Sequence, residues 1–408
     1  MGGEVRFGGA SHLLSEVVEG PPLCTHPRSG ILHPRPFPPE RPMARGKRNP
    51  PPSQTQPSGP RPPILGHEAV LRRLQSYHRQ RWRGGTMLWA GPPAVGKKTL
   101  ALRFAQGYLC EQGVFLGCGT CRACRLVERG QHPDVLVFTV EAGQTHSIED
   151  VWRFQHQVAL RPWHGDVKFF LWDDAERMRQ EAANAMLKTL EEPPEDTVTI
   201  LITSQVYRIL PTIRSRAQIL RFGPVREDVL LSYLLRQGEW TEAEARWIIR
   251  WSQGRPGWVL QPRNFWEFHK RLRRAVLDWF QQWLSQPQEA WWRYMEMDLR
   301  PLVGLAQEVF RVPGGIYTAD GWVWNRWWVQ QVVLHGLMIL RDLYWLRLGL
   351  RHLIVNVDVV GTLERMAAWV EPAWIEGRVE AWMGFLHDLE VYHFGGAWQV
   401  PGRLTAWS

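Results

Sequence analysis

The chain has 408 residues, is 44% apolar and 22% charged, and carries a net charge of +9. This length excludes a single small module, because it supplies enough apolar residues for two or three packed domains. The positive charge favours an acidic partner, nucleic acid first, although a basic surface kept only for solubility explains the charge equally well.

Residues 1–63 contain 15 of the 30 prolines, which predicts a disordered lead-in. Residues 1–20 lack a basic start followed by an apolar run, and the apolar segment 332–350 is interrupted by three charged residues. We therefore expect no secretory signal and no membrane span, and a soluble, cytoplasmic protein without membrane contact.

From residue 64 to about 224, helical patterns alternate with apolar strands, which predicts a parallel α/β domain. The strands are continuous apolar runs, as expected when both faces of a sheet are covered. An amphipathic helix stopped by Pro193 and Pro194 follows one of them. The predicted strands are 86–90, 135–140, 169–173, 197–203 and 217–222, and further helices are predicted over 68–82, 97–110 and 148–160.

The strands stop after Pro224, and residues 225–262 have the pattern of a small helical unit of the kind that covers a nucleotide as a lid. Residues 263–408 are predicted to be mostly helical. Tryptophans recur there at helical spacing, which favours a core face, with base or cofactor stacking as the alternative. These tryptophans are Trp279, Trp283, Trp327, Trp328, Trp369, Trp374 and Trp382.

The sequence GPPAVGKKT follows the first strand and opens a helix, which is the setting of a phosphate-binding loop. Gly91 and Gly96 allow the backbone to close around phosphates, and Lys97 would reach the outer phosphates of ATP or ADP. Lys98 takes the place of the hydroxyl residue that normally binds Mg²⁺, and Thr99 lies about 100° further around the helix. We expect weak or absent Mg²⁺ coordination, and a loop retained only for structure is the alternative.

Four cysteines, Cys110, Cys118, Cys121 and Cys124, fall within fifteen residues. In a reducing compartment this spacing favours a metal over disulfides. Four thiolates suit a tetrahedral Zn²⁺ without an open position, so the predicted role of the metal in this module, 110–124, is structural.

Polar residues end the third and fourth strands. Asp173 stands where a carboxylate orients a metal ion, and Thr203 stands where a side chain can sense the outer phosphate. Asp174 occupies the place of the glutamate that polarises the attacking water, but its side chain is one methylene shorter. Since a displacement of about 1 Å can cost about 100-fold in rate, this predicts little or no ATPase activity.

The segment LPTIRSRA leads into the fifth strand. Arg216 within it is a candidate arginine finger for a neighbouring subunit's nucleotide, and an ion pair with a local carboxylate is the alternative.

Over residues 64 to about 260, these motifs together with HPDVLVF, WDDAERMRQEAANAMLKTLEEPP and LITS resemble the clamp-loader branch of the AAA+ family. The resemblance implies a RecA-like α/β P-loop domain with a zinc-module insert (64–224), a helical lid (225–262) and an all-α collar (263–408) that assembles into a ring of five subunits. It also implies a part in bacterial DNA polymerase III, where such rings load the sliding clamp onto primed DNA. The implied partners are the gamma/tau motor subunits, the clamp-opening delta subunit, the clamp and, through the complex, DNA.

The resemblance further implies a stator, a non-motor subunit that lends the arginine of its SRC motif to the adjacent motor. Ser215 and Arg216 match that motif, and Ala217 replaces its cysteine. Motor subunits have a Ser or Thr at the position of Lys98, a glutamate at that of Asp174, and a phosphate-contacting arginine in the lid, at the position of Gly257. Arg255 is a candidate substitute for that arginine.

Two other functions remain open on the sequence alone. The first is an active gamma/tau-type ATPase, which the intact Gly91, Gly96, Lys97 and Asp173 favour. The second is a zinc protein that binds DNA without partners.

Overall fold

The computed structural model describes residues 61–141, 144–163, 165–285, 317–318, 321–322 and 326–391. They divide into two compact units, one ending at Pro262 and the other beginning at Arg263. Of the segment predicted to be disordered, 1–63, all but the last three residues lie outside the described part. Within the described ranges, no helix has the length and apolar character needed to cross a bilayer.

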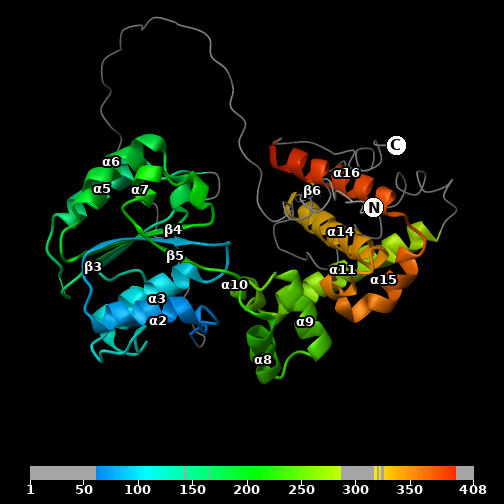
Figure 1. Cartoon of the computed structure of the whole chain (residues 1–408), viewed down its shortest axis with the longest axis horizontal. Helices are drawn as coiled ribbons and strands as arrows, with labels where there is room; N and C mark the ends of the chain where they lie inside the picture. The colour runs from blue at the N-terminus through cyan, green and yellow to red at the C-terminus, as the bar shows by residue number, and fades with distance from the viewer. Residues whose placement is uncertain are drawn as a thin grey trace, which may run out of the picture. The chain divides into compact units, whose positions relative to one another are not determined.

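A five-stranded sheet, in which every paired strand is parallel, forms the centre of the first unit (Figure 1). The strands are β1 (Gly85–Ala90), β2 (Val135–Phe138), β3 (Lys168–Trp172), β4 (Thr197–Thr203) and β5 (Gln218–Arg221). They lie in the order β2-β3-β4-β1-β5. All residues of β3 and β4 are buried, which explains why apolar residues predominate in both strands.

Helices cover both faces of this sheet, so the predicted α/β class is confirmed (Figure 1). Met87, Trp89 and Phe104 belong to the core beneath α2 and α3, whereas Leu88 and Phe154 belong to the core beneath α5, α6 and α7. The alternation of β1 side chains between the two cores follows from the period of two in a strand. The helices are α2 (Glu68–Arg79), α3 (Lys97–Leu109), α4 (Arg122–Glu128), α5 (Ile148–Val158), α6 (Gln180–Glu191) and α7 (Pro211–Arg214), with single 3₁₀ turns η1 (Ala175–Arg177) and η2 (Val206–Arg208).

Three helices complete the first unit after the sheet: α8 (Glu227–Gln237), α9 (Glu242–Trp251) and α10 (Pro256–Val259). Thr241 begins α9 with a capping box, in which its hydroxyl accepts the Glu244 N–H and the Glu244 carboxylate accepts the Thr241 N–H. Leu230 and Ile248 are fully buried. The amphipathic pattern of residues 226–259 therefore corresponds to helices that share a small core.

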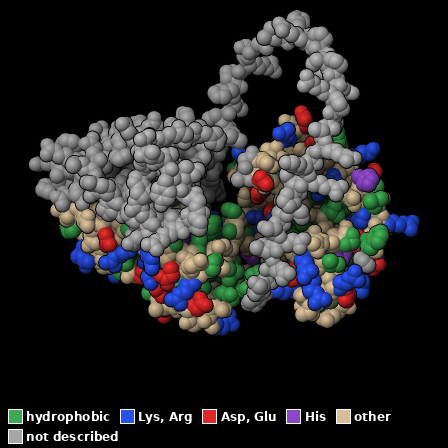
Figure 2. Space-filling view, turned by 180° about the vertical axis from the view of Figure 1, so that it is seen from behind, with side chains coloured by type: hydrophobic (Ala, Val, Ile, Leu, Met, Phe, Trp, Pro, Cys, Tyr) green, Lys and Arg blue, Asp and Glu red, His purple; other side chains and the backbone are tan. Residues whose placement is uncertain are grey.

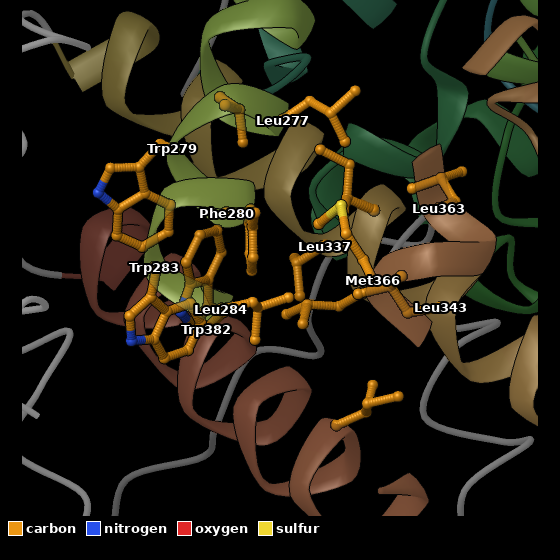
Figure 3. Close-up of a cluster of buried hydrophobic side chains, with 14 of the residues drawn as sticks. Leu277, Trp279, Phe280, Trp283, Leu284, Leu337, Leu343, Leu363, Met366 and Trp382 are labelled. Atoms are coloured by element: carbon orange, nitrogen blue, oxygen red, sulfur yellow. The ribbon is translucent and has the colours of Figure 1, made fainter. Parts of the chain in front are cut away.

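In the described residues of the second unit, four helices surround one apolar cluster (Figure 3). They are α11 (Arg263–Leu284), α14 (Arg326–Arg347), α15 (Val360–Ala367) and α16 (Pro372–Val391), with 3₁₀ turns η4 (Arg351–Leu353) and η5 (Val357–Val359) and a short antiparallel pair, β6 (Tyr317–Thr318) and β7 (Gly321–Trp322). The cluster draws on all four helices, as Phe280, Leu337, Leu363 and Trp382 illustrate.

The expectation that tryptophans form the core of this unit is confirmed for Trp279, Trp283 and Trp382, each at most 4% exposed. Trp374 packs against the same cluster, with its ring centroid 5.1 Å from that of Trp283. The expectation is wrong for Trp369, which is 47% exposed because it follows the end of α15 rather than lying within a helix. The side chains of Trp327 and Trp328 lie outside the described part of the chain.

Candidate nucleotide site and cysteine cluster

The phosphate loop joins the carboxyl end of β1 to the start of α3. The N–H of Gly91 donates to the Thr203 carbonyl at 3.2 Å, and a Cβ on Gly91 would lie 2.1 Å from the Phe222 carbonyl oxygen. Only glycine fits there. Gly96 has φ of 97° and directly precedes α3, a conformation that glycine adopts without a steric penalty. The local backbone is therefore the one that the sequence predicts.

Lys97 turns back onto its own loop. Its ammonium donates to the carbonyls of Gly91 at 2.6 Å and Pro92 at 2.7 Å, and the residue is only 6% exposed. Burial lowers the pKa of Lys97 to about 8, while three nearby carboxylates oppose that shift. A phosphate would have to displace both hydrogen bonds before this ammonium could bind it.

Lys98 forms an ion pair with the predicted metal-orienting carboxylate. Its Nζ lies 2.9 Å from Oδ2 of Asp173, which follows the carboxyl end of β3. The N–H of Asp173 donates to the Phe138 carbonyl at 3.0 Å and fixes the backbone at this point. A lysine ammonium thus pairs with the candidate metal-orienting carboxylate, as the expectation of weak or absent Mg²⁺ coordination would require.

Two further candidate positions follow β3 and end β4. Asp174 has a left-handed backbone, with φ and ψ both 50°, and burial together with the neighbouring carboxylates raises its pKa. The hydroxyl of Thr203, which is 1% exposed, accepts the N–H of Gln205 at 3.0 Å. Thr99 lies half-buried on α3, two residues after Lys97.

The start of α10 lies directly on the phosphate loop. The N–H of Gly257 donates to the Ala94 carbonyl at 2.7 Å, and a Cβ on Gly257 would lie 2.8 Å from that oxygen. Residue 257 therefore has no room for a side chain in this arrangement. The guanidinium of Arg255 bonds within its own turn instead, to the Ser252 carbonyl at 3.1 Å and to Gln253 Oε1 at 2.9 Å.

Arg216, just after α7, is held at the surface. Its guanidinium lies 2.7 Å from Oε1 of Glu191 and donates to the Thr212 carbonyl at 2.9 Å. The Arg216 side chain remains 35% exposed and that of Glu191 46% exposed. The local ion pair left open by the sequence therefore forms, but a pair this exposed contributes at most about 1 kcal/mol. A stronger acceptor such as a phosphate could replace it.

The four cysteines converge between α3 and α4. Their sulfur atoms all lie within 4.8 Å of one another, and Cys118 Sγ is 4.0 Å from Cys124 Sγ. Sulfurs around a tetrahedral Zn²⁺ are about 3.8 Å apart, so the cluster fits such an ion after small shifts. Hydrogen bonds from Thr120 and Cys121 lower the pKa of Cys118 to about 6, which favours the thiolate. The four residues can bind a metal ion, and their chemistry is consistent with zinc.

Two residues that the sequence did not single out support this region. Glu176 accepts the Ser204 N–H at 3.0 Å and so ties the turn after β3 to the end of β4. His67 Nε2 contacts the Val95 carbonyl at 2.9 Å and supports the phosphate loop from the start of α2. The only sequence signal for Glu176 and His67 was their position near the predicted ends of a strand and a helix.

Known proteins share this sequence pattern. A family profile described as "DNA polymerase III, delta subunit" matches residues 66–226. The DNA polymerase III delta-prime subunit of Pseudomonas aeruginosa is 42% identical over 131 residues, 31% of this chain and 39% of that protein. That of Escherichia coli is 31% identical over 199 residues, 46% of this chain and 59% of that protein. Residues 66–226 are thus similar to DNA polymerase III delta-prime subunits.

The clamp-loader resemblance is thus confirmed, although the chain spans less than two thirds of each of these delta-prime relatives. The chain is also similar to the DNA polymerase III tau subunit of Bacillus subtilis, which is 30% identical over 169 residues, 41% of this chain and 30% of that protein. A solved DNA polymerase III gamma subunit-related protein from Thermotoga maritima is 19% identical and aligns with 79% of this chain and 99% of its own, with a TM-score of 0.38.

Proposed function

We propose that this chain is a stator, a non-motor delta-prime subunit of a DNA polymerase III clamp loader, which acts in the cytoplasm. In this function it helps to load the sliding clamp onto primed DNA. The observation that carries the proposal is the 2.9 Å ion pair between Lys98 and Asp173. It supports a subunit that retains the architecture of an ATP site without the chemistry to use it.

The ion pair opposes Mg²⁺ in two ways. The ammonium of Lys98 already neutralises the Asp173 carboxylate, so a divalent ion gains less from binding it. A fixed positive charge next to the site also repels the ion. Phosphoryl transfer depends on a metal that bridges the outer phosphates, so weak Mg²⁺ binding alone would suppress hydrolysis.

The phosphate loop gives a second line of support. Lys97 is engaged with the Gly91 and Pro92 carbonyls, and Gly257 is packed against Ala94. In a motor subunit, the lysine at position 97 and an arginine at position 257 would contact the phosphates of the nucleotide. ATP or ADP binding at this site would therefore be weak, and static if it occurs.

Arg216 is the group proposed to act in catalysis, on a neighbour's nucleotide. It follows the short helix α7, is partly exposed, and gives up only a surface ion pair with Glu191 when it moves to another acceptor. As a finger, its planar guanidinium would donate to the phosphate oxygens of ATP bound to the adjacent gamma/tau subunit and stabilise the charge of the transition state.

The cysteine cluster is proposed to hold one structural Zn²⁺. The ion would bind the thiolates of Cys110, Cys118, Cys121 and Cys124 and leave no position open for substrate. Because Cys110 ends α3 and Cys121 begins α4, the metal would fix the angle between these two helices.

We also propose a role for each part of the chain and a set of partners. Residues 64–224 form its α/β domain, 225–262 its lid and 263–408 its ring-forming collar, with gamma/tau, delta and the clamp as partners. DNA would be reached through the complex. On the face shown in Figure 2, Lys and Arg side chains of the described residues are interspersed with Asp and Glu, so this face does not favour a DNA-binding protein that acts without partners.

Steady-state ATP turnover of the purified full-length chain, with Mg²⁺ present, tests the proposal. We expect no turnover above that of a Lys97→Ala variant, because the cation site is neutralised by Lys98. Turnover that Lys97→Ala abolishes would instead establish the alternative, an active gamma/tau-type motor.

A further inference from the structure

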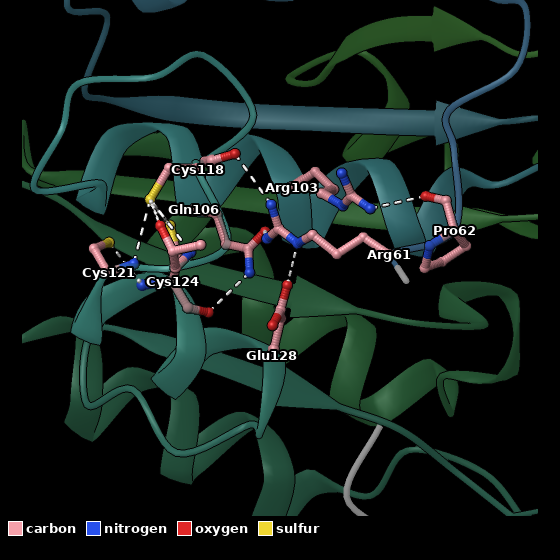
Figure 4. A network of polar contacts seen from close by, with 10 residues as sticks. Arg61, Pro62, Arg103, Gln106, Cys118, Cys121, Cys124 and Glu128 are labelled. Atoms are coloured by element: carbon pink, nitrogen blue, oxygen red, sulfur yellow. Dashed lines mark hydrogen bonds and ion pairs between the residues drawn. The ribbon is translucent and has the colours of Figure 1, made fainter. Parts of the chain in front are cut away.

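The loop and helices that carry the four cysteines are contacted by an arginine from outside the segment that the family profile matches. Arg61 lies five residues before the start of that match, at the end of the proline-rich lead-in. The Pro62 carbonyl beside it accepts a hydrogen bond from Arg103 on α3 at 2.8 Å, which anchors the backbone next to Arg61. Figure 4 shows the Arg61 side chain extending from this anchor to the cysteine module.

The Arg61 guanidinium joins three parts of that module (Figure 4). It donates to the Gly117 carbonyl at 3.1 Å, to Gln106 Oε1 at 2.6 Å and to the carboxylate of Glu128, with which it forms an ion pair. Gly117 precedes Cys118 in the loop, Gln106 lies on α3, and Glu128 ends α4. One side chain thus fixes the loop and both helices that carry the cysteines.

The contact continues to the cysteines themselves. Gln106 is 1% exposed, and its amide donates to the Cys124 carbonyl at 2.9 Å. The guanidinium also lies close to Gly119, where an added Cβ would be 2.6 Å from Arg61 Cζ. Gly119, with φ of 80°, thus gives the guanidinium room to lie against the loop between Cys118 and Cys121.

We propose that Arg61 is a positioning residue for the metal site, which holds the four thiolates in place and slows the loss of the ion. This inference rests on the proposed Zn²⁺. Glu128 balances the charge of Arg61, so the fork of N–H donors matters here more than the positive charge. Residues that orient metal ligands in this way typically change metal affinity by about 10- to 100-fold when they are replaced.

The experiment measures the rate at which Zn²⁺ passes from the full-length protein to a chromogenic chelator. Arg61→Gln is expected to release the ion about tenfold faster than the unsubstituted chain. Arg61→Lys should release Zn²⁺ nearly as fast as Arg61→Gln does, because an ammonium cannot donate to three acceptors in the arginine geometry. Arg125→Gln is the matched control. Arg125 is exposed on α4, and its substitution removes the same charge from the same module.

A second readout separates positioning from unfolding. In Co²⁺-substituted Arg61→Gln, the absorption bands of a tetrahedral tetrathiolate site should persist, because all four ligands remain. The inference would be overturned if Arg61→Gln lost these bands or released Zn²⁺ at the rate of the unsubstituted chain. It would also be overturned if Arg61→Lys released Zn²⁺ as slowly as the unsubstituted chain, or if Arg125→Gln released it as fast as Arg61→Gln. Absence of zinc from the unsubstituted protein would instead refute the proposed metal site.

Discussion

A positive charge carried by the chain itself lies beside Asp173. The Lys98 side chain is 44% exposed and that of Asp173 24% exposed, so the ion pair forms at the rim of the site and not in the core. Such a pair contributes little to folding stability. Its consequence is chemical, because it determines which cation the carboxylate can bind.

Replacement of Lys98 by threonine should restore a dependence on Mg²⁺. The variant loses the repelling ammonium and gains the hydroxyl that Mg²⁺ sites of this kind use. We expect Mg²⁺ to strengthen ATP binding by about tenfold in Lys98→Thr, about 1.4 kcal/mol, and to have little effect in the unsubstituted chain. Calorimetric titration with and without Mg²⁺ measures this ratio. Lys188→Thr, at an exposed position of α6, is the control, and an unchanged ratio in Lys98→Thr would contradict the role given to Lys98.

Gly257 should not accept even a methyl group. Because its added Cβ would lie 2.8 Å from the Ala94 carbonyl oxygen, Gly257→Ala is expected to destabilise the first unit by about 1–3 kcal/mol. At Gly223 an added Cβ meets nothing within 4 Å, so Gly223→Ala serves as the control. Urea denaturation gives both values, and equal midpoints for the two variants would show that α10 does not pack on the phosphate loop as described.

For single residues, the sequence predicted a position in the site only where a motif fixes that position. The phosphate-loop pattern places Lys98 where a hydroxyl residue is usual, and the strand that ends in two acids places Asp173 where a metal-orienting carboxylate belongs. The sequence therefore indicates both positions but not that they form an ion pair. Glu191 and Arg61 had no such signal. The partner of each lies 25 or more residues away and is brought close only by the fold, as Arg216 and Gly117 are.

The strands and helices show where sequence patterns stop being sufficient. The apolar runs located all five strands, but the run 135–140 pairs only from Val135 to Phe138, because the end of an edge strand is set by its neighbour β3. Thr139 and Val140 lie beyond that pairing. Trp369 illustrates the same limit for helices, since helical spacing does not reveal that α15 ends before it.

A buried histidine pair connects α11 and α14 and gives the second unit a predicted response to acid. His269 Nδ1 lies 3.0 Å from His335 Nε2, and burial lowers the pKa of His269 to about 4. The pKa of His335 is also well below its usual value, mainly because of burial and to a smaller extent because of the nearby His269 and Arg273. The unfolded chain therefore takes up protons near pH 6.5 that the folded chain does not bind, so stability should fall as the pH drops from about 6.5 towards 4.

Each histidine should contribute up to about 1.4 kcal/mol per pH unit in this window. Thermal or urea denaturation of the full chain at a series of pH values measures the slope. His335→Gln should reduce it by about one histidine's share, whereas His352→Gln, at an exposed position, should leave it unchanged. A slope that His335→Gln does not alter would contradict the buried, uncharged state of this residue.

For the whole molecule, architecture and catalysis are separate in the proposed function. In the proposed function, the parallel sheet, phosphate loop and α8–α10 are the retained architecture of an ATP site. The Lys98–Asp173 ion pair and the close packing of Gly257 on Ala94 are the features proposed to oppose Mg²⁺ and nucleotide there. Arg216 remains exposed and weakly held. The proposed activity is therefore exerted on a neighbour, and the isolated chain would show none of it.

The most direct test is the ATP turnover of a clamp loader reconstituted from gamma/tau, delta and this chain, on primed DNA with the clamp present. With Arg216→Ala, we expect the site served by this residue to slow by about 1,000-fold, which removes that site's share of total turnover. Arg208→Ala, an exposed arginine of η2, is the matched control and should leave turnover unchanged. Full turnover with Arg216→Ala in an intact complex would contradict the account.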